Sequence, residues 1–361
     1  MKITAFFIGI LFISVQYIDA QNDYLYNDSH FHLTNYIQKG TDIEEFLKIM
    51  GDDVGRVALF GIPLQQTWAY ENTGDYAPGY YLQTDAPLYY YSFTDAHIAM
   101  AYKSLSEEQK KRFDPMITGF NPADMYAVDH IKRVLKTFPG VFSGIGEFSI
   151  HKEFVSAKVA GPTASLNNPA LDKILDFCEE SGLLIILHSD IDVPFQKPNQ
   201  LPTYVKQMRD LFSRHPNTTI IWAHTGLGRV VHPAKSGAVS PGERTPGHLE
   251  IIEKALTLDE FKNLHFDISW DEVAKYVVSS PENLQKTADL INKYPDRFLF
   301  GTDVVAPDSK EMYLAVYNMY QPLWDKLTPE AKNKVTKENY IRLFDEANKK
   351  VRSWEKGNLE N

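Results

Sequence analysis

The chain alternates between short apolar segments and amphipathic segments along most of its length, and this alternation limits the folds that it can adopt. Two of the apolar segments, Leu183–Leu187 and Thr219–Trp222, are continuous runs, as in parallel strands covered on both faces. In all, eight candidate strands can be read from the sequence: the segment into Asp28–His32, Val54–Ile62, Phe113–Phe120, Phe142–Ile150, Leu183–Asp190, Thr218–Thr225, Leu264–Trp270 and Arg297–Val304.

Helical patterns lie between these strands. The amphipathic segments are Ile43–Met50, Asp124–Thr137, Pro169–Ser181, Leu201–Arg214, His248–Ala255 and Ser280–Lys293, and a helical tail follows from Thr328. Strands that alternate with helices are typical of βα units and a parallel sheet. Eight such units in 361 residues fit a (β/α)₈ TIM barrel with inserted loops better than an open sheet. We therefore predict an α/β fold, with residues 21–361 forming one barrel domain.

Two insertions follow predicted strands. The segment Leu64–Lys110 comes after the second strand and is crowded with aromatic residues, among them Trp68, whereas Val230–Gly247 comes after the sixth strand and is rich in Gly, Pro and Ser. Loops that follow strands lie on the catalytic face of such a barrel. The aromatic insertion is expected to serve either as a stacking lid over a substrate or as a contact in a homo-oligomer.

The first twenty residues have the pattern of a secretory signal peptide. Lys2 precedes an apolar run, and Ala20 offers a small residue for cleavage before Gln21. The apolar run is short for a membrane span and no second candidate follows, so we expect a periplasmic or secreted protein with no stable membrane anchor after cleavage. An uncleaved anchor, or a cytosolic protein with an apolar start, is the alternative.

Composition limits the partners. Apolar residues make up 43% of the chain, enough for a normal core, and the formal net charge is −10. Because an acidic surface repels phosphate backbones, nucleic acid is not an expected partner, and a small molecule is the expected substrate. Cys178 is the single cysteine and is expected to be a small core residue.

Polar side chains that can bind metals fall at the ends of the predicted strands. In Asp28–His32 two imidazoles stand at i and i+2, which on a strand places both on the same face. The remaining residues of this kind that close a predicted strand are Glu147, His188, His224 and Asp303. Barrels place their active-site groups at this end of the strands, and imidazole with carboxylate is a ligand set for Zn²⁺ or another first-row metal.

Each of these residues also has an ordinary explanation when it is taken alone. A histidine that ends an apolar strand is commonly a hydrogen-bonded core residue, Asp303 could cap a helix, and Glu147 could pair with a lysine. Together, however, the residues reach the same end of one predicted barrel. Their joint occurrence favours a metal site.

The sequence resembles the amidohydrolase superfamily, and within it the amidohydrolase-related group that also includes non-oxidative decarboxylases. The matching segments are Asp28–His32, Leu187–His188, Trp222–Gly226, Phe300–Asp303 and Glu338–Phe344. The resemblance implies that His30, His32, His188 and Asp303 bind a divalent metal. It also implies that His224 is either a ligand or a group that polarises the substrate.

The sequence departs from the binuclear branch of that superfamily at the fourth strand. No lysine ends this strand, so a carboxylated lysine cannot bridge two metals. The segment Gly144–Glu147 stands there instead and is similar to the TatD-like nucleases, where a glutamate at such a position bridges two ions. Glu147 is therefore a candidate ligand, and the site could hold one ion or two.

This ligand set predicts a hydrolase that cleaves a C–O or C–N bond of a small amide, lactone or ester with a metal-activated water. Asp303 would be the proton shuttle and His224 would polarise the carbonyl. Asp28 is a candidate partner of a ligand histidine. For substrate binding the candidates are Arg229, which could equally form a surface salt bridge, Trp270, which could instead start the next helix, and Trp68. The alternatives to a hydrolase are a metal-dependent decarboxylase and a non-catalytic periplasmic binding protein.

Overall fold

A nine-stranded parallel sheet forms the centre of the molecule. The computed structural model describes residues 24–35, 39–62, 64–67, 88–91, 93–152, 165–193, 200–228, 237–240 and 243–358. In these residues the strands follow the order β12-β11-β8-β7-β6-β5-β2-β1-β13. Their bounds are β1 Tyr26–His32, β2 Val54–Phe60, β5 Phe113–Ile117, β6 Gly144–Ser149, β7 Leu184–His188, β8 Ile220–Trp222, β11 Leu264–Asp267, β12 Phe298–Leu299 and β13 Val304–Val305.

The sheet closes on itself because its two edge strands come from one stretch of chain. β12 pairs with β11, and β13, which begins five residues after the end of β12, pairs with β1. Between them, the Ser29 amide donates to the Phe300 carbonyl, and the Asp303 amide donates to the His30 carbonyl. β12 and β13 thus act as one interrupted strand, and each of the eight predicted segments contains a strand. The predicted α/β barrel is confirmed.

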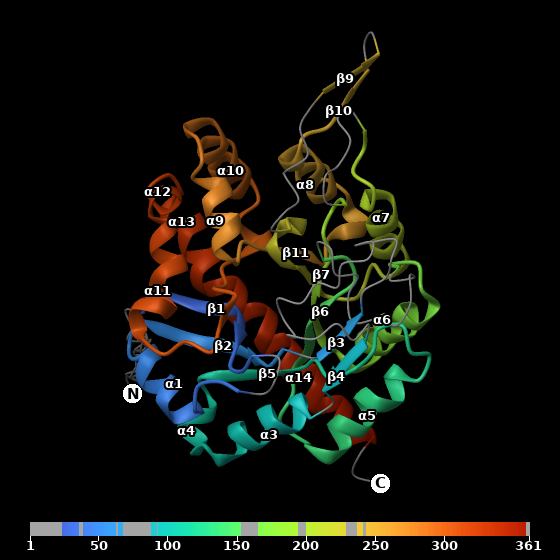
Figure 1. Cartoon of the computed structure of the whole chain (residues 1–361), viewed down its shortest axis with the longest axis vertical. Helices are drawn as coiled ribbons and strands as arrows, with labels where there is room; N and C mark the ends of the chain where they lie inside the picture. Colours follow the sequence, from blue (N-terminus) through green and yellow to red (C-terminus); the bar gives the residue numbers. More distant parts are fainter. Residues whose placement is uncertain are drawn as a thin grey trace, which may run out of the picture.

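Helices surround the sheet (Figure 1). Most predicted helices are present within a few residues of their expected bounds, because their ends carry clear signals. Asn168 caps α6 and Pro169 is its first residue, while Gly182 ends it at a φ of 79°. The helix bounds are α1 Ile43–Met50, α3 Thr94–Ser104, α4 Glu107–Lys110, α5 Ala127–Thr137, α6 Pro169–Ser181, α7 Val205–Arg214, α8 His248–Leu256, α9 Asp271–Val277, α10 Pro281–Lys293, α11 Lys310–Met319, α12 Gln321–Trp324, α13 Pro329–Asn333 and α14 Asn339–Asn358.

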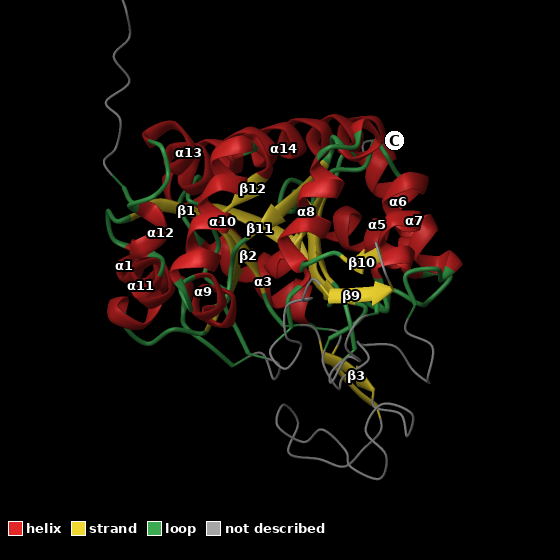
Figure 2. Cartoon of the chain, turned by 90° about the horizontal axis from the view of Figure 1, so that it is seen from above, coloured by secondary structure: helices red, strands yellow, loops and turns green. Residues whose placement is uncertain are grey.

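Two apolar cores stabilise the barrel. The larger one lies between the sheet and the surrounding helices. The smaller one fills the barrel, where alternate residues such as Leu184 and Ile186 of β7 meet Leu343 and Phe344 of α14. Helix α14 runs across one end of the strands (Figure 2). The functional groups gather at the opposite end, where the strands finish.

The two insertions fall where the sequence predicts them. After β2, strand β3 (Leu64–Thr67) pairs antiparallel with β4 (Leu88–Tyr91), and α3 and α4 follow. After β8, strand β9 (Gly237–Ser240) pairs antiparallel with β10 (Glu243–Thr245). Both hairpins lie on the side of the barrel away from α14 (Figure 2).

The N-terminal segment Met1–Ala20, predicted to be a signal peptide, lies outside the described residues. Among the helices that the structure describes, none is both long enough and apolar enough to span a bilayer. Cys178 is buried in α6, and burial raises the pKa of its thiol. It is a core residue, as predicted.

Candidate metal centre

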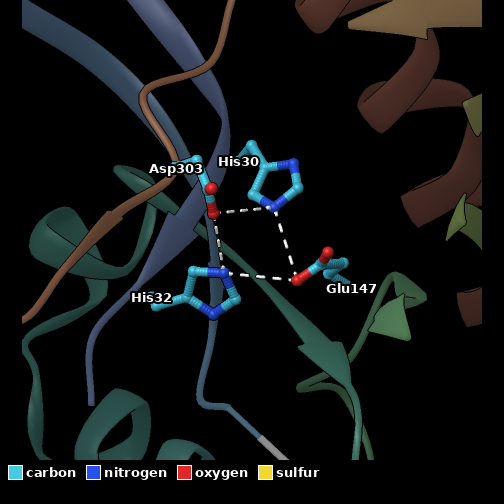
Figure 3. A group of neighbouring side chains, drawn as sticks. All are labelled: His30, His32, Glu147 and Asp303. Carbon is cyan, nitrogen blue, oxygen red and sulfur yellow. Dashed lines mark hydrogen bonds and ion pairs between the residues drawn. The ribbon is translucent and has the colours of Figure 1, made fainter. Parts of the chain in front are cut away.

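His30 and His32 project from β1 toward the same side, as their i, i+2 spacing predicts. Both are buried. The Nδ1 atom of His30 lies 3.0 Å from Oδ2 of Asp267, and that of His32 lies 3.2 Å from the Gly61 carbonyl oxygen. A neutral imidazole carries its proton on the nitrogen that faces such an acceptor. The Nε2 atoms of both rings therefore face Asp303 and Glu147 at the centre of the site (Figure 3).

Asp303 lies opposite these two rings, in the break between β12 and β13. Its Oδ1 atom is 3.3 Å from Nε2 of His30 and 3.1 Å from Nε2 of His32. Gly301 makes this approach feasible, because a Cβ atom there would stand 2.7 Å from Cβ of His30. The side chain of Asp303 is 13% exposed, whereas that of Glu147 is 5% exposed and that of His30 is fully buried. Asp303 is thus the most accessible of the acidic and imidazole groups that meet here.

Glu147 reaches the site because β6 changes register between Ile145 and Phe148. Both of these apolar residues pack into the outer core, so Gly146 and Glu147 lie between them on the inner side. At Gly146 φ is 129° and a Cβ atom would stand 2.4 Å from the Ile186 carbonyl oxygen, which requires a glycine.

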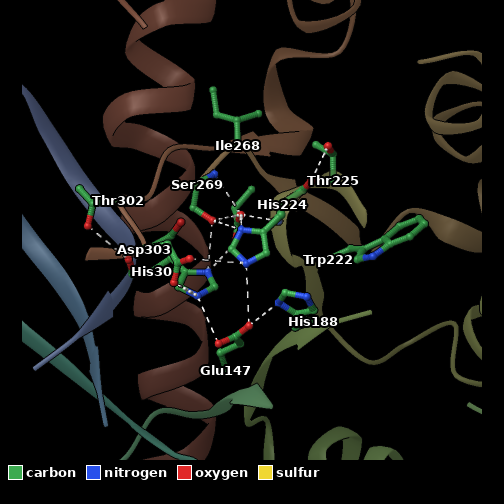
Figure 4. A network of polar contacts seen from close by, with 12 residues as sticks. His30, Glu147, His188, Trp222, His224, Thr225, Ile268, Ser269, Thr302 and Asp303 are labelled. Carbon is green, nitrogen blue, oxygen red and sulfur yellow. Dashed lines mark hydrogen bonds and ion pairs between the residues drawn. The ribbon is translucent and has the colours of Figure 1, made fainter. Parts of the chain in front are cut away.

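The two carboxylate oxygens of Glu147 face different groups of histidines. Oε2 lies 3.7 Å from Nε2 of His30 and 3.5 Å from Nε2 of His32. Oε1 lies 2.5 Å from Nδ1 of His188 and 3.8 Å from Nε2 of His224. Glu147 stands between the rings of His30 and His188 (Figure 4). The Glu147 carboxylate therefore joins the His30–His32 pair to the His188–His224 pair.

His188 closes β7, as predicted, and each nitrogen of its ring faces a carboxylate oxygen. Its Nε2 atom lies 3.1 Å from Oδ1 of Asp190. Nδ1 then meets Oε1 of Glu147 at 2.5 Å. A neutral ring can donate to only one of these two carboxylates, so the other contact needs a proton or a cation between the two atoms.

His224 lies just beyond β8, in a turn at Ala223–Gly226, and not on the predicted strand itself. It and Thr225 have φ values of 57° and 53°, a left-handed conformation that non-glycine residues seldom adopt. The His224 amide donates to Oδ1 of Asp267 at 2.8 Å. On the ring, Nδ1 lies 2.9 Å from Oγ of Ser269 and Nε2 faces Glu147.

Asp267 ends β11 and was not singled out by the sequence analysis. Asp28, which was proposed there as a partner for a ligand histidine, accepts hydrogen bonds from the His30 amide, from the amide and hydroxyl of Thr302 and from the Tyr313 hydroxyl. It joins β1 to the segment that carries Asp303, and Asp267 is the carboxylate that contacts the His30 ring. A polar residue closing the seventh strand is the signal that could have identified Asp267.

These side chains form groups that can hold metal ions. Nε2 of His30 and Nε2 of His224 are buried and form no hydrogen bond with the described residues, which suits atoms that serve as ligands. The groups whose donor atoms lie within 4.8 Å of one another are His30–His32–Glu147–Asp303, Glu147–His188–His224 and His30–His224–Asp267. The first two share Glu147.

The carboxylates and imidazoles of the site shift one another's pKa values. Burial lowers the pKa of His30, but the charges of Asp303 and Asp267 outweigh it and hold that pKa well above its usual value. Burial opposes ionisation of Glu147, yet Lys152 and His188 keep its pKa well below the usual range. These carboxylates favour positive charge at the centre of the site, which a proton on an imidazole or a metal ion can supply.

Of the residues predicted to bind substrate, only Trp270 is described. It is buried beside the site, with its ring centroid 5.0 Å from that of His224. Trp68 and Arg229 lie outside the described residues. The roles assigned to these three residues stay predictions.

The family model described as Amidohydrolase matches residues 28–345, which include every residue of these groups. The chain belongs to the amidohydrolase family. A comparison with curated proteins finds no match. As an amidohydrolase with a buried cluster of histidines and carboxylates suited to a divalent ion, the protein is a metal-dependent enzyme of that superfamily.

The chain is similar to solved structures over most of its length. An uncharacterised TIM-barrel protein from Bordetella bronchiseptica is 16% identical, with a TM-score of 0.53 over 89% of this chain and 99% of the other. An amidohydrolase from Burkholderia multivorans is 11% identical, with a TM-score of 0.50 over the same shares. A TatD family hydrolase from Entamoeba histolytica is 10% identical, with a TM-score of 0.46 over 93% of this chain and 98% of the other.

Proposed function

We propose that this amidohydrolase is a hydrolase that cleaves a C–O or C–N bond in a small amide, lactone or ester, with one or two divalent ions bound at its centre. The observation that carries the proposal is the position of Glu147. Its two oxygens divide between the His30–His32 pair and the His188–His224 pair, at distances of 2.5 to 3.8 Å.

The residues present fit such an ion. Nε2 of His30 and Nε2 of His224 are buried without hydrogen bonds to the described residues, and Nδ1 of His188 faces an oxygen of Glu147 at 2.5 Å. Neutral imidazoles and carboxylates are donors for zinc or another first-row ion. Such an ion would act as a Lewis acid on the substrate and would lower the pKa of a water molecule that it binds.

Asp303 is proposed as the proton shuttle. Its carboxylate is the most exposed acidic group of the cluster, so a water molecule and a substrate can reach it. Burial raises the pKa of Asp303, but its contacts with the His30 and His32 rings lower it further, and the net shift is well below the usual value. Asp303 is therefore ionised and can accept the proton of the attacking water, then pass it to the leaving group.

For His224 we propose a ligand role instead of the polarising role that the sequence suggested. Ser269 Oγ donates to Oδ1 of Asp267, so its oxygen is free to accept the Nδ1 proton of His224. Burial also lowers the pKa of His224, which keeps the ring neutral. Nε2 then carries a lone pair, and a lone pair binds an ion but cannot donate to a carbonyl oxygen.

The metal assignment is tested by replacing His30 and His32 together with alanine. The double variant should lose bound metal and activity while the barrel stays folded. His215→Ala is a matched control, because His215 is also buried but contacts Asp172 away from the site. It should retain metal. Full metal content in the double variant would refute the assignment.

A pH-stat separates hydrolysis from the alternative decarboxylation. Hydrolysis of an ester or a lactone releases a proton in each turnover near neutral pH, whereas decarboxylation of a carboxylate consumes one and releases CO₂. Screening lactones, esters and phenolic acids with both readouts should show acid release without CO₂. Proton uptake with CO₂ release would instead establish the lyase.

A further inference from the structure

Asp267 and Ser269 are neither ion ligands nor proton shuttles in the chemistry proposed above, yet they touch two of its histidines. Asp267 ends β11 with its side chain fully buried, and Ser269 follows two residues later, also buried. Oδ2 of Asp267 lies 3.0 Å from Nδ1 of His30. Oδ1 accepts from the backbone amide of His224 at 2.8 Å, from the backbone amide of Ser269 at 3.1 Å and from the hydroxyl of Ser269.

This arrangement determines which nitrogen of each ring carries the proton. When the His30 ring is neutral, its Nδ1 donates a hydrogen bond to Asp267 and its Nε2 carries no proton. The Ser269 hydroxyl donates its hydrogen to Asp267, so its oxygen can accept a hydrogen bond from Nδ1 of His224 at 2.9 Å. Ser269 lies beside the His224 ring (Figure 4). The Asp267 carboxylate therefore favours an unprotonated Nε2 on two histidines, one from each ligand group. It acts on His30 directly and on His224 through the Ser269 hydroxyl.

Asp267 also holds the backbone of His224. The consecutive left-handed residues His224 and Thr225 are in a conformation that persists only where surrounding contacts impose it. The hydrogen bond from the His224 amide to Oδ1 is such a contact. It joins the end of β11 to the turn after β8, two strands that are neighbours in the sheet.

The group His30–His224–Asp267 is geometrically close enough to hold an ion itself. Its hydrogen bonds argue against this. Three donors already surround Oδ1 of Asp267, and Oδ2 faces the protonated nitrogen of His30. An ion there would have to replace these donors at every position.

We propose that Asp267, acting with Ser269, is the positioning residue that orients His30 and His224 for metal binding and couples the two ligand groups. This inference rests on the proposed metal site and extends it to residues that touch no substrate. An acceptor of this kind behind a ligand histidine typically contributes 10- to 100-fold in metal affinity.

The test is a Co²⁺ titration of the chelator-treated mature chain, followed by the visible ligand-field spectrum and by calorimetry. Asp267→Asn should weaken Co²⁺ binding about 10- to 100-fold and change the spectrum, because the His30 ring loses its acceptor. Ser269→Ala should have a smaller effect, since His30 loses only its 3.3 Å contact with Ser269 Oγ and keeps Asp267 as its closer acceptor. Its small volume change also makes it the safer variant for folding.

Asp95→Asn is the matched control. Asp95 is a buried carboxylate that accepts hydrogen bonds from the amides of Thr118 and Gly119, and within the described residues it forms no hydrogen bond with a histidine of the site. It should lower thermal stability without changing the Co²⁺ affinity. The inference fails if Asp267→Asn binds Co²⁺ within twofold of the wild type, or if Asp95→Asn weakens binding equally. A wild-type chain that binds no Co²⁺ would instead refute the proposed function.

Discussion

Nδ1 of His188 lies 2.5 Å from Oε1 of Glu147, at the junction of the two ligand groups. If this carboxylate bridges two ions, Glu147→Gln should lower the metal content from about two ions to one, because an amide offers one oxygen and one NH₂ group where the carboxylate offers two oxygens. Elemental analysis beside the wild type measures this. An unchanged metal count with a lower melting temperature would make Glu147 a structural partner of His188 only.

Asp303→Asn tests the proton shuttle. The amide has nearly the same shape but cannot accept the proton of the attacking water, so kcat should fall about 10²-fold or more. Part of the metal should remain, because the imidazoles of His30 and His32 still face the site. The two measurements are kcat and metal content on the same preparation. A variant with normal kcat would exclude Asp303 as the base.

A buried histidine on β11 predicts loss of stability in acid. Burial, with the charges of Arg297 and Arg342, lowers the pKa of His265 to about 3, against about 6.5 in the unfolded chain. Below pH 6.5 the unfolded state therefore binds the proton first. The stability present above pH 6.5 is lost as the pH falls from 6.5 toward 3.

His265→Gln removes this titration. Between pH 6 and pH 4, the free energy of unfolding of the wild type should fall more steeply than that of the variant, by up to about 1.4 kcal/mol per pH unit. Urea unfolding at several pH values measures both slopes. His151 and His248, with pKa values lowered by burial to about 4, contribute equally to both proteins. Parallel slopes would show that His265 is not kept neutral in the folded state.

Export remains a proposal that rests on the pattern of Met1–Ala20 alone. We expect the mature protein from its native host to begin near Gln21 and to be found in the periplasm or the medium. Intact-mass measurement of the fractionated protein provides the check. A cytosolic protein that retains Met1 would contradict the proposal.

Much of the fold could be predicted because its signals are local. Continuous apolar runs such as Leu183–Leu187 became buried parallel strands, and caps such as Asn168 with Pro169 set the helix bounds. The spacing of His30 and His32 placed both rings on one face, since side chains alternate along a strand. Closing the strands into a barrel then brought His188, Glu147 and Asp303 to the same end.

The contacts that orient these side chains could not be predicted in the same way. The bond between His30 and Asp267 joins residues 237 positions apart, whereas the sequence pattern had indicated Asp28 for that role. The register change that turns Glu147 inward and the left-handed turn at His224 depend on contacts with neighbouring strands. No local pattern encodes them.

The sequence by itself thus determined the eight strand positions and the kind of side chain that ends each of them, because periodicity and capping act over a few residues. Tertiary structure alone decided how Glu147 divides its oxygens between two pairs of histidines, and which nitrogen of His30 and of His224 is left bare. These outcomes depend on hydrogen bonds between distant segments, and such bonds exist only once the barrel has closed.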